Sequence, residues 1–109
     1  FDQLANNADR KAGHCLVDRD GHVWGIDHGL CFHPDPKLRT VIWDFVGEAI
    51  DDALLEDVAR LARTSLPEAL ATHLRGDEVD GLAARIRDVV RRRRFAPPQT
   101  GNPYPWPLV

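Results

Sequence analysis

The sequence predicts an α+β fold in which a small β-hairpin precedes a bundle of helices. Residues 14–17 and 22–26 are short runs rich in β-branched and aromatic residues, and an Asp-Arg-Asp-Gly turn separates them. This turn favours a hairpin because Asp-Gly accepts the positive φ that such turns need. Residues 51–63 and 77–94 place apolar side chains three and four positions apart, which is typical of amphipathic helices. A length of 109 residues with 43% hydrophobic residues fits one domain with its own core.

The other segments are predicted from local signals. Residues 1–8 have the spacing of a helix that begins upstream, and residues 9–13 form a polar loop that ends in Gly. The stretch Ser65-Leu66-Pro67-Glu68 has the pattern of a capping box. We expect it to open a short helix that Gly76 closes.

Two segments are expected to add to the core. Residues 41–50 contain a cluster of apolar side chains and are predicted to be buried, so that residues 41–95 would be mostly helical; the cluster comprises Trp43, Phe45 and Val46. Asp44, within this cluster, would then need a partner such as Arg39 or Arg10. Five of the eight prolines fall in residues 97–109, which predicts an extended tail that Trp106 and Leu108 pin to the body.

Composition and charge exclude some classes of function. The net charge of −3 argues against broad electrostatic capture of nucleic acid. The basic run at 91–94 is typical of a solvated helix end. No apolar stretch is long enough to span a bilayer, so we expect a cytoplasmic protein without membrane contact. Cys15 and Cys31 lie in no CxxC pair, which favours free thiols over a disulfide.

Chemically informative residues are concentrated around the hairpin. Asn6-Asn7-Ala8-Asp9-Arg10-Lys11-Ala12-Gly13-His14 precedes it, and Ile26-Asp27-His28-Gly29 follows it. Because the two mouths of a hairpin lie side by side, one tight turn should bring Asp9, His14 and Asp27 close together. A phosphotransfer site needs one carboxylate that orients the attacking hydroxyl and another that holds a divalent cation on the phosphates.

This arrangement resembles the phosphatidylinositol 3-/4-kinase superfamily, which is related to the protein kinases. In that superfamily an Asp-Arg motif is followed, five residues after the Asp, by a metal-binding Asn, then by a hairpin and an Ile-Asp-Phe-Gly motif. Here Asp9-Arg10, the hairpin and Ile26-Asp27-His28-Gly29 occur in the same order. The Asn7-Ala8-Asp9-Arg10 form is most similar to the type II phosphatidylinositol 4-kinases. Over most of the chain the sequence also resembles a family of small actinobacterial proteins grouped with that superfamily.

The resemblance implies roles for individual residues. It makes Asp9 the catalytic base, with Arg10 and Lys11 in the same catalytic motif, and Asp27 the principal metal ligand. Asn7, His14 and Asp27 would bind the cofactors, ATP and Mg²⁺ or Mn²⁺, with His14 and Asp27 on the metal. His14 stands where the family has Asn, and imidazole nitrogen suits Mn²⁺ or Zn²⁺ better than Mg²⁺.

The resemblance also implies a kinase-like C-terminal lobe at residues 1–96, followed by the tail at 97–109. Residues 1–29 would carry the catalytic loop, the hairpin and the metal loop. No Gly-rich loop and no strand Lys of the kinase type is present. We therefore expect a missing N-terminal lobe of the same polypeptide as partner, and no turnover of ATP by this segment alone. The face toward that lobe would be apolar and would favour self-association.

Two other functions remain open. The first is a pseudokinase or nucleotide-binding module without turnover, because His14 replaces the metal-binding Asn. The second is a transition-metal protein in which His14, Asp27 and His28, together with Cys31 or His33, bind zinc. Structural roles compete with both: His28 and His33 can serve packing, and the hairpin aspartates can cap turns.

Overall fold

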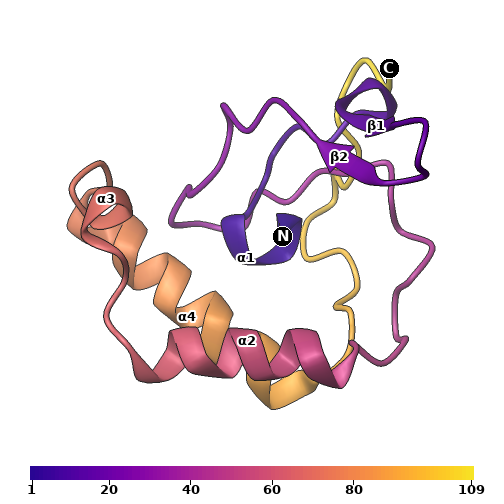
Figure 1. Ribbon diagram of the computed structural model, residues 1–109. Helices are drawn as coiled ribbons and strands as arrows, with labels where there is room; N and C mark the ends of the chain where they lie inside the picture. Colours follow the sequence, from indigo (N-terminus) through magenta and orange to yellow (C-terminus); the bar gives the residue numbers. More distant parts are fainter.

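The computed structural model describes residues 1–109 and has an α+β architecture (Figure 1). Strands β1 (Cys15–Val17) and β2 (Val23–Gly25) form one antiparallel hairpin, in which Leu16 pairs with Trp24. The Asp18 carboxylate accepts hydrogen bonds from the amides of Asp20 and His22, at 2.9 and 3.0 Å. These bonds and the positive φ of Gly21 (+80°) close the turn, which confirms the predicted hairpin.

Helix α1 (Asp2–Ala5) is a single turn that leads into the loop before the hairpin. Asn6 ends it in the left-handed conformation, with φ of 55°. A short 3₁₀ turn, η1 (Ala12–His14), then delivers the chain to β1. The expected helix end and loop are therefore present.

The core lies between two long helices and the segments that flank them. Helix α2 (Asp52–Arg63) packs against α4 (Gly76–Arg92), and α1 packs on α4 as well. Leu55 of α2 and Val89 of α4 are buried together with Ile50, and partly buried side chains surround them: Leu4, Val58 and Phe95. Both amphipathic helices are confirmed, because their apolar stripes face each other.

The capping box expected at Ser65 is not formed. Helix α3 (Glu68–Ala71) starts after Pro67, and no side chain caps it. Gly76 does not close this helix but begins α4. Pro67 is the residue just before the helix and has a non-helical ψ of 135°, so the helix begins only at Glu68.

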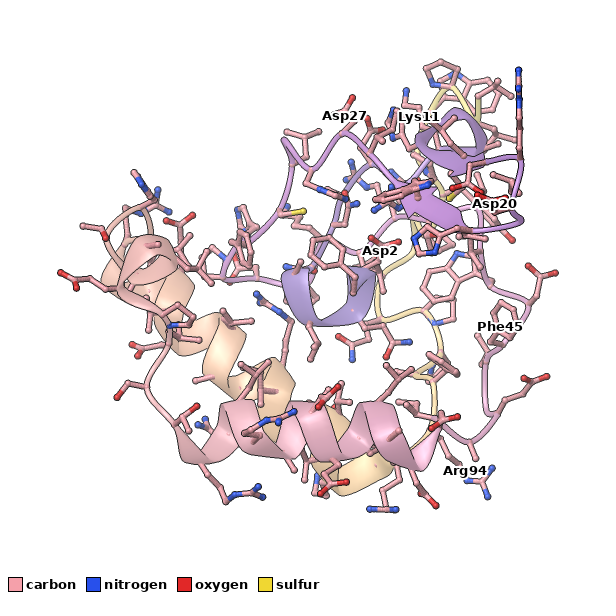
Figure 2. All side chains as sticks on the ribbon, viewed as in Figure 1. Asp2, Lys11, Asp20, Asp27, Phe45 and Arg94 are labelled. Carbon is pink, nitrogen blue, oxygen red and sulfur yellow. The ribbon has the colours of Figure 1, made fainter.

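Residues 41–50, predicted to be a buried and mostly helical segment, form an irregular stretch with a turn at the surface. Phe45 is 49% exposed, and Figure 2 shows it on the outer side of this stretch. Gly47, at the end of the turn, has a positive φ of 81°, a conformation that glycine adopts without strain. Val46 is 40% exposed as well, so the expected burial is wrong for Phe45 and Val46, and only Trp43 of the cluster is partly buried.

The proline-rich tail is extended and returns to the hairpin, as Figure 1 shows for its yellow C-terminal end. The Pro103 carbonyl accepts hydrogen bonds from the Thr40 amide and the Trp43 indole, at 3.0 and 3.1 Å. Pro105 is buried, whereas Trp106 is 84% exposed. The tail is therefore attached through its backbone and Pro105, and the expected anchoring by the Trp106 ring is wrong.

None of the helices has the length and apolar character needed to cross a membrane.

Candidate phosphotransfer site at the hairpin mouth

The loop before the hairpin is fixed by a fully buried asparagine. The Asn7 side chain donates a hydrogen bond to the Asp2 carboxylate at 3.1 Å and accepts one from the Asp9 amide at 3.0 Å. The Asn7 carbonyl accepts from the Arg39 amide at 3.0 Å. The Asn7 side chain therefore holds the Asp9 backbone in place, and both its donor and its acceptor group are used in hydrogen bonds within the protein.

Arg10 ties the helix to both mouths of the hairpin. Its guanidinium forms two 2.9 Å hydrogen bonds with the Asp2 carboxylate. It also donates to the carbonyl oxygens of His14 and Ile26, at 3.1 and 3.0 Å. With its side chain 4% exposed, Arg10 faces the interior, and its four hydrogen bonds link α1 to both mouths of the hairpin.

The ion pair changes the titration of both partners. Burial alone would raise the pKa of Asp2, but hydrogen bonds from Arg10 and Asn7 and the charge of Arg10 hold that pKa below its usual range. The hydrogen bond to Asp2 raises the pKa of Arg10. Both groups are therefore charged wherever the protein is folded at ordinary pH.

His14 and Asp27 meet across the hairpin mouth, as the sequence predicts for the two ends of a hairpin. His14 Nε2 lies 3.4 Å from Asp27 Oδ2. The imidazole is largely buried, whereas the Asp27 side chain is 61% exposed. Asp27 also has a positive φ of 56°, an uncommon conformation for a residue other than glycine, and such strain is enriched at functional sites.

Asp9 and Lys11 lie beside this pair. The Asp9 carbonyl is 2.9 Å from His14 Nδ1, and the Asp9 carboxylate is 3.6 Å from Lys11 Nζ. Figure 2 shows Lys11 and Asp27 on the same side of the molecule, with Asp20 at the turn. Two side-chain pairs, Asp9 with Lys11 and His14 with Asp27, therefore lie at one end of the hairpin, and the contact between His14 Nδ1 and the Asp9 carbonyl links them.

The other candidate metal ligands are engaged elsewhere. The His28 ring packs on Phe1, with centroids 4.7 Å apart, and His33 Nδ1 accepts a hydrogen bond from the Asp35 amide at 3.0 Å. Cys15 and Cys31 are free thiols, and burial raises the pKa of Cys31. No group of three or more His, Cys, Asp or Glu side chains is arranged to hold a metal ion. The zinc set considered from the sequence is therefore not assembled.

Two protein ligands do fit a cation that arrives with a nucleotide. Mg²⁺ in phosphoryl-transfer sites keeps several waters and takes only one or two carboxylates besides the phosphates. The facing pair of His14 and Asp27 supplies one carboxylate and one imidazole, with Asp27 exposed and His14 largely buried.

The comparisons with known proteins give one curated relative. The chain is 46% identical over 110 residues to Protein Rv2133c of Mycobacterium tuberculosis (strain ATCC 25618 / H37Rv). The match covers 98% of this chain and 40% of the relative, so the chain spans well under half of that protein's length. No family model matches the chain, and no solved structure matches it.

Sequence reasoning missed two residues that organise the site. The first is Asp2, the ion-pair partner of Arg10. Arg10 therefore does not pair with Asp44, which was expected in a buried ion pair with Arg39 or Arg10; Asp44 is exposed and forms no ion pair. The second missed residue is Asn6. Asn6 is buried and holds the loop after the hairpin, because its amide donates to the His33 and Asp35 carbonyls at 2.8 and 2.7 Å. The available signal was the position of Asp2 and Asn6 beside the Asp9-Arg10 motif.

A separate apolar groove of about 410 Å³ lies between α1, the irregular stretch and α2. Most of its lining is hydrophobic, and several of these side chains are exposed: Phe1, Ile42, Phe45, Val46, Leu54 and Leu61. Exposed apolar surface of this kind is typical of interaction sites.

Proposed function

We propose that the chain is the catalytic and metal-binding segment of an ATP-dependent phosphotransferase of the phosphatidylinositol 3-/4-kinase-like type, in its C-terminal lobe. The proposal rests chiefly on the 3.4 Å approach of His14 Nε2 and Asp27 Oδ2 at the hairpin mouth, next to Asp9. The order of motifs that carries the family resemblance and this geometry support the same function. We place the protein in the cytoplasm, with no nucleic acid or membrane as partner.

Within this proposal, Asp9 orients the acceptor hydroxyl and accepts its proton. Lys11, 3.6 Å from Asp9, neutralises charge on the transferred phosphoryl group. His14 and Asp27 would hold Mg²⁺ or Mn²⁺, which supplies charge neutralisation between the phosphates of ATP. Arg10 keeps both mouths of the hairpin in register, and Asn7 keeps Asp9 in place.

The experiment is transfer of labelled γ-phosphate from ATP by the whole polypeptide that contains this chain. Asp9→Asn and Asp27→Asn should each lower transfer by at least about 100-fold, the lower range for loss of a positioned proton acceptor or cation ligand. Asp20→Asn, an equal change at the exposed turn, is the matched control and should keep full transfer. Wild-type rates in both site variants would disprove the assignment.

A nucleotide-binding module without turnover is the second candidate, and a specific observation favours it. His14 occupies the position where the resembled family has a metal-binding Asn, and its ring is held by the Asp9 carbonyl. Saturable ATP binding that depends on Asp27, with no transfer to any acceptor under Mg²⁺ or Mn²⁺, would select this candidate.

The partner in the proposal is the rest of a longer polypeptide, which would cover the apolar groove and supply the nucleotide-binding lobe. The length of the relative supports a longer polypeptide, because the match covers only 40% of that protein. Leu54, 57% exposed in the groove, and Leu16, 47% exposed on the hairpin, form a matched pair for the test. Leu54→Asp should abolish pull-down of the remainder by this segment, while Leu16→Asp should not. Dimers of the segment that Leu54→Asp disperses would show instead that a second copy covers the groove.

A further inference from the structure

The ring of His14 has a defined tautomer. Its Nδ1 atom is 2.9 Å from the Asp9 carbonyl oxygen, which can only accept a hydrogen bond, so Nδ1 must carry the proton. The Lys11 amide is 3.4 Å from the same nitrogen, a longer contact that would require the opposite tautomer. The shorter contact decides, because an unprotonated Nδ1 would place two acceptors 2.9 Å apart.

The fixed tautomer leaves the lone pair of neutral imidazole on Nε2, which faces Asp27. In the doubly protonated ring Nε2–H would face the Asp27 carboxylate as an ion pair, whereas in the neutral ring the Nε2 lone pair and the carboxylate oxygen lie 3.4 Å apart and can bind one cation between them. Metal-binding histidines typically donate the other ring N–H to a carbonyl or carboxylate, as His14 does to Asp9. The pair is therefore arranged as one nitrogen and one oxygen ligand.

The frame around the pair is rigid on one side and adjustable on the other. Arg10 donates to the His14 and Ile26 carbonyls and so fixes the backbone next to both ligands. The Asp27 carboxylate is mostly exposed and can move to meet a cation. The nitrogen ligand is thus the fixed member of the pair, and its chemistry sets the preference for the metal.

We infer that this site selects Mn²⁺, or a similar first-row divalent cation, over Mg²⁺, and that His14 is the residue responsible. The inference deepens the proposed phosphotransferase and rests on its assignment of Asp27 as a cation ligand. Mg²⁺ is a hard cation that prefers oxygen and dehydrates reluctantly, whereas imidazole suits transition metals. An oxygen donor at position 14 would remove the discrimination.

The test measures binding of MnCl₂ directly, without nucleotide and without an activity readout. In ¹H–¹⁵N spectra of the protein, Mn²⁺ should broaden the amide signals of residues 13–15 and 26–28 first, because paramagnetic broadening falls steeply with distance. MgCl₂ should reverse the broadening only at an excess of about tenfold or more, in line with the preference of nitrogen ligands for transition metals.

Variants at two histidines locate the discrimination. In His14→Asn the side-chain amide can still donate to the Asp9 carbonyl, and MgCl₂ should then displace Mn²⁺ at comparable concentration. His22→Asn makes the same change on the exposed turn and should keep the wild-type ratio. Asp27→Asn should weaken both cations, and asparagine tolerates the positive φ of that position.

The inference is overturned if the Mn²⁺/Mg²⁺ ratio is the same in His14→Asn and wild type, or if broadening centres on the Asp18–Asp20 turn. Amide spectra of the metal-free variants establish that each is folded. The Mn²⁺/Mg²⁺ ratio does not depend on phosphoryl transfer. If the protein transfers phosphate with Mg²⁺ and the ratio is unchanged in His14→Asn, the inference is rejected and the proposed function stands. Mn²⁺ selection at this site without any transfer would reject the enzyme assignment and keep the inference.

Discussion

The buried ion pair of Arg10 and Asp2 is the contact whose removal should disturb the protein most clearly. The Arg10 and Asp2 side chains are 4% and 21% exposed, and four hydrogen bonds leave the guanidinium. Arg10→Met would leave the Asp2 carboxylate without its cation and the Ile26 carbonyl without its Arg10 donor, whereas the His14 carbonyl would keep its hydrogen bond from the Ile26 amide. Breaking a buried pair in this way costs about 3–5 kcal/mol of unfolding free energy. Since a domain is stable by about 5–15 kcal/mol, the variant should be marginally stable.

Urea unfolding followed by tryptophan fluorescence measures this loss. The double variant Arg10→Met/Asp2→Leu removes the unpaired charge as well, so it should be more stable than Arg10→Met alone. A loss below about 1 kcal/mol in Arg10→Met would refute the reasoning, because it would place the pair in the class of solvent-exposed ion pairs.

The pH dependence provides an independent check of the same pair. The pKa of Asp2 in the folded protein lies below its ordinary value, so the stabilisation by Asp2 is fully present above the pKa of the unfolded chain and is lost as pH falls through the folded pKa. Asp2→Asn should therefore flatten the acid limb of the stability curve below about pH 4. An unchanged acid limb would contradict the assigned pKa shift.

Two further predictions concern the helices and the turn. Leu55→Ala, at a side chain 4% exposed, should cost about 2–5 kcal/mol in urea unfolding, whereas Leu54→Ala, at one 57% exposed, should change stability by about 0.5 kcal/mol or less; similar losses at both positions would contradict the assigned core. The Trp24 indole donates to the Asp18 carboxylate at 3.0 Å and lowers its pKa, so the turn should loosen only as pH falls below 3.8. The Trp24 indole resonance should shift in that range and stay constant in Asp18→Asn; a wild-type resonance that does not titrate would argue against the hydrogen bond.

Local patterns in the sequence predicted the elements that depend on local physics. The hairpin follows from the Asp-Gly turn at 20–21, and the two long helices follow from apolar residues three and four positions apart. The segment at 41–50 was predicted wrongly, since its aromatic residues indicated burial but the turn ending at Gly47 carries Phe45 to the surface. Burial depends on contacts between distant segments, and composition alone does not specify them.

The candidate site was predictable in part. The proximity of His14 and Asp27 follows from the hairpin, because residues just outside its two strands are neighbours. The interior position of Arg10 was not predictable, because the motif identifies the residue but not the direction of its side chain. Asp2 and Asn6 lie beside the Asp9-Arg10 motif, but that position does not identify their hydrogen-bond partners, so their roles were missed.

The attachment of the tail has a consequence for how the segment is made. The Ala12 amide, in the loop that leads to His14, donates to the Leu108 carbonyl at 3.0 Å. During synthesis the Leu108 carbonyl is added 96 positions after Ala12, so the Ala12 amide cannot form this hydrogen bond until the tail has been made. Maturation of the loop is therefore a late event, and ribosome-stalled chains that stop before the tail should expose the Ala12 amide to rapid hydrogen exchange.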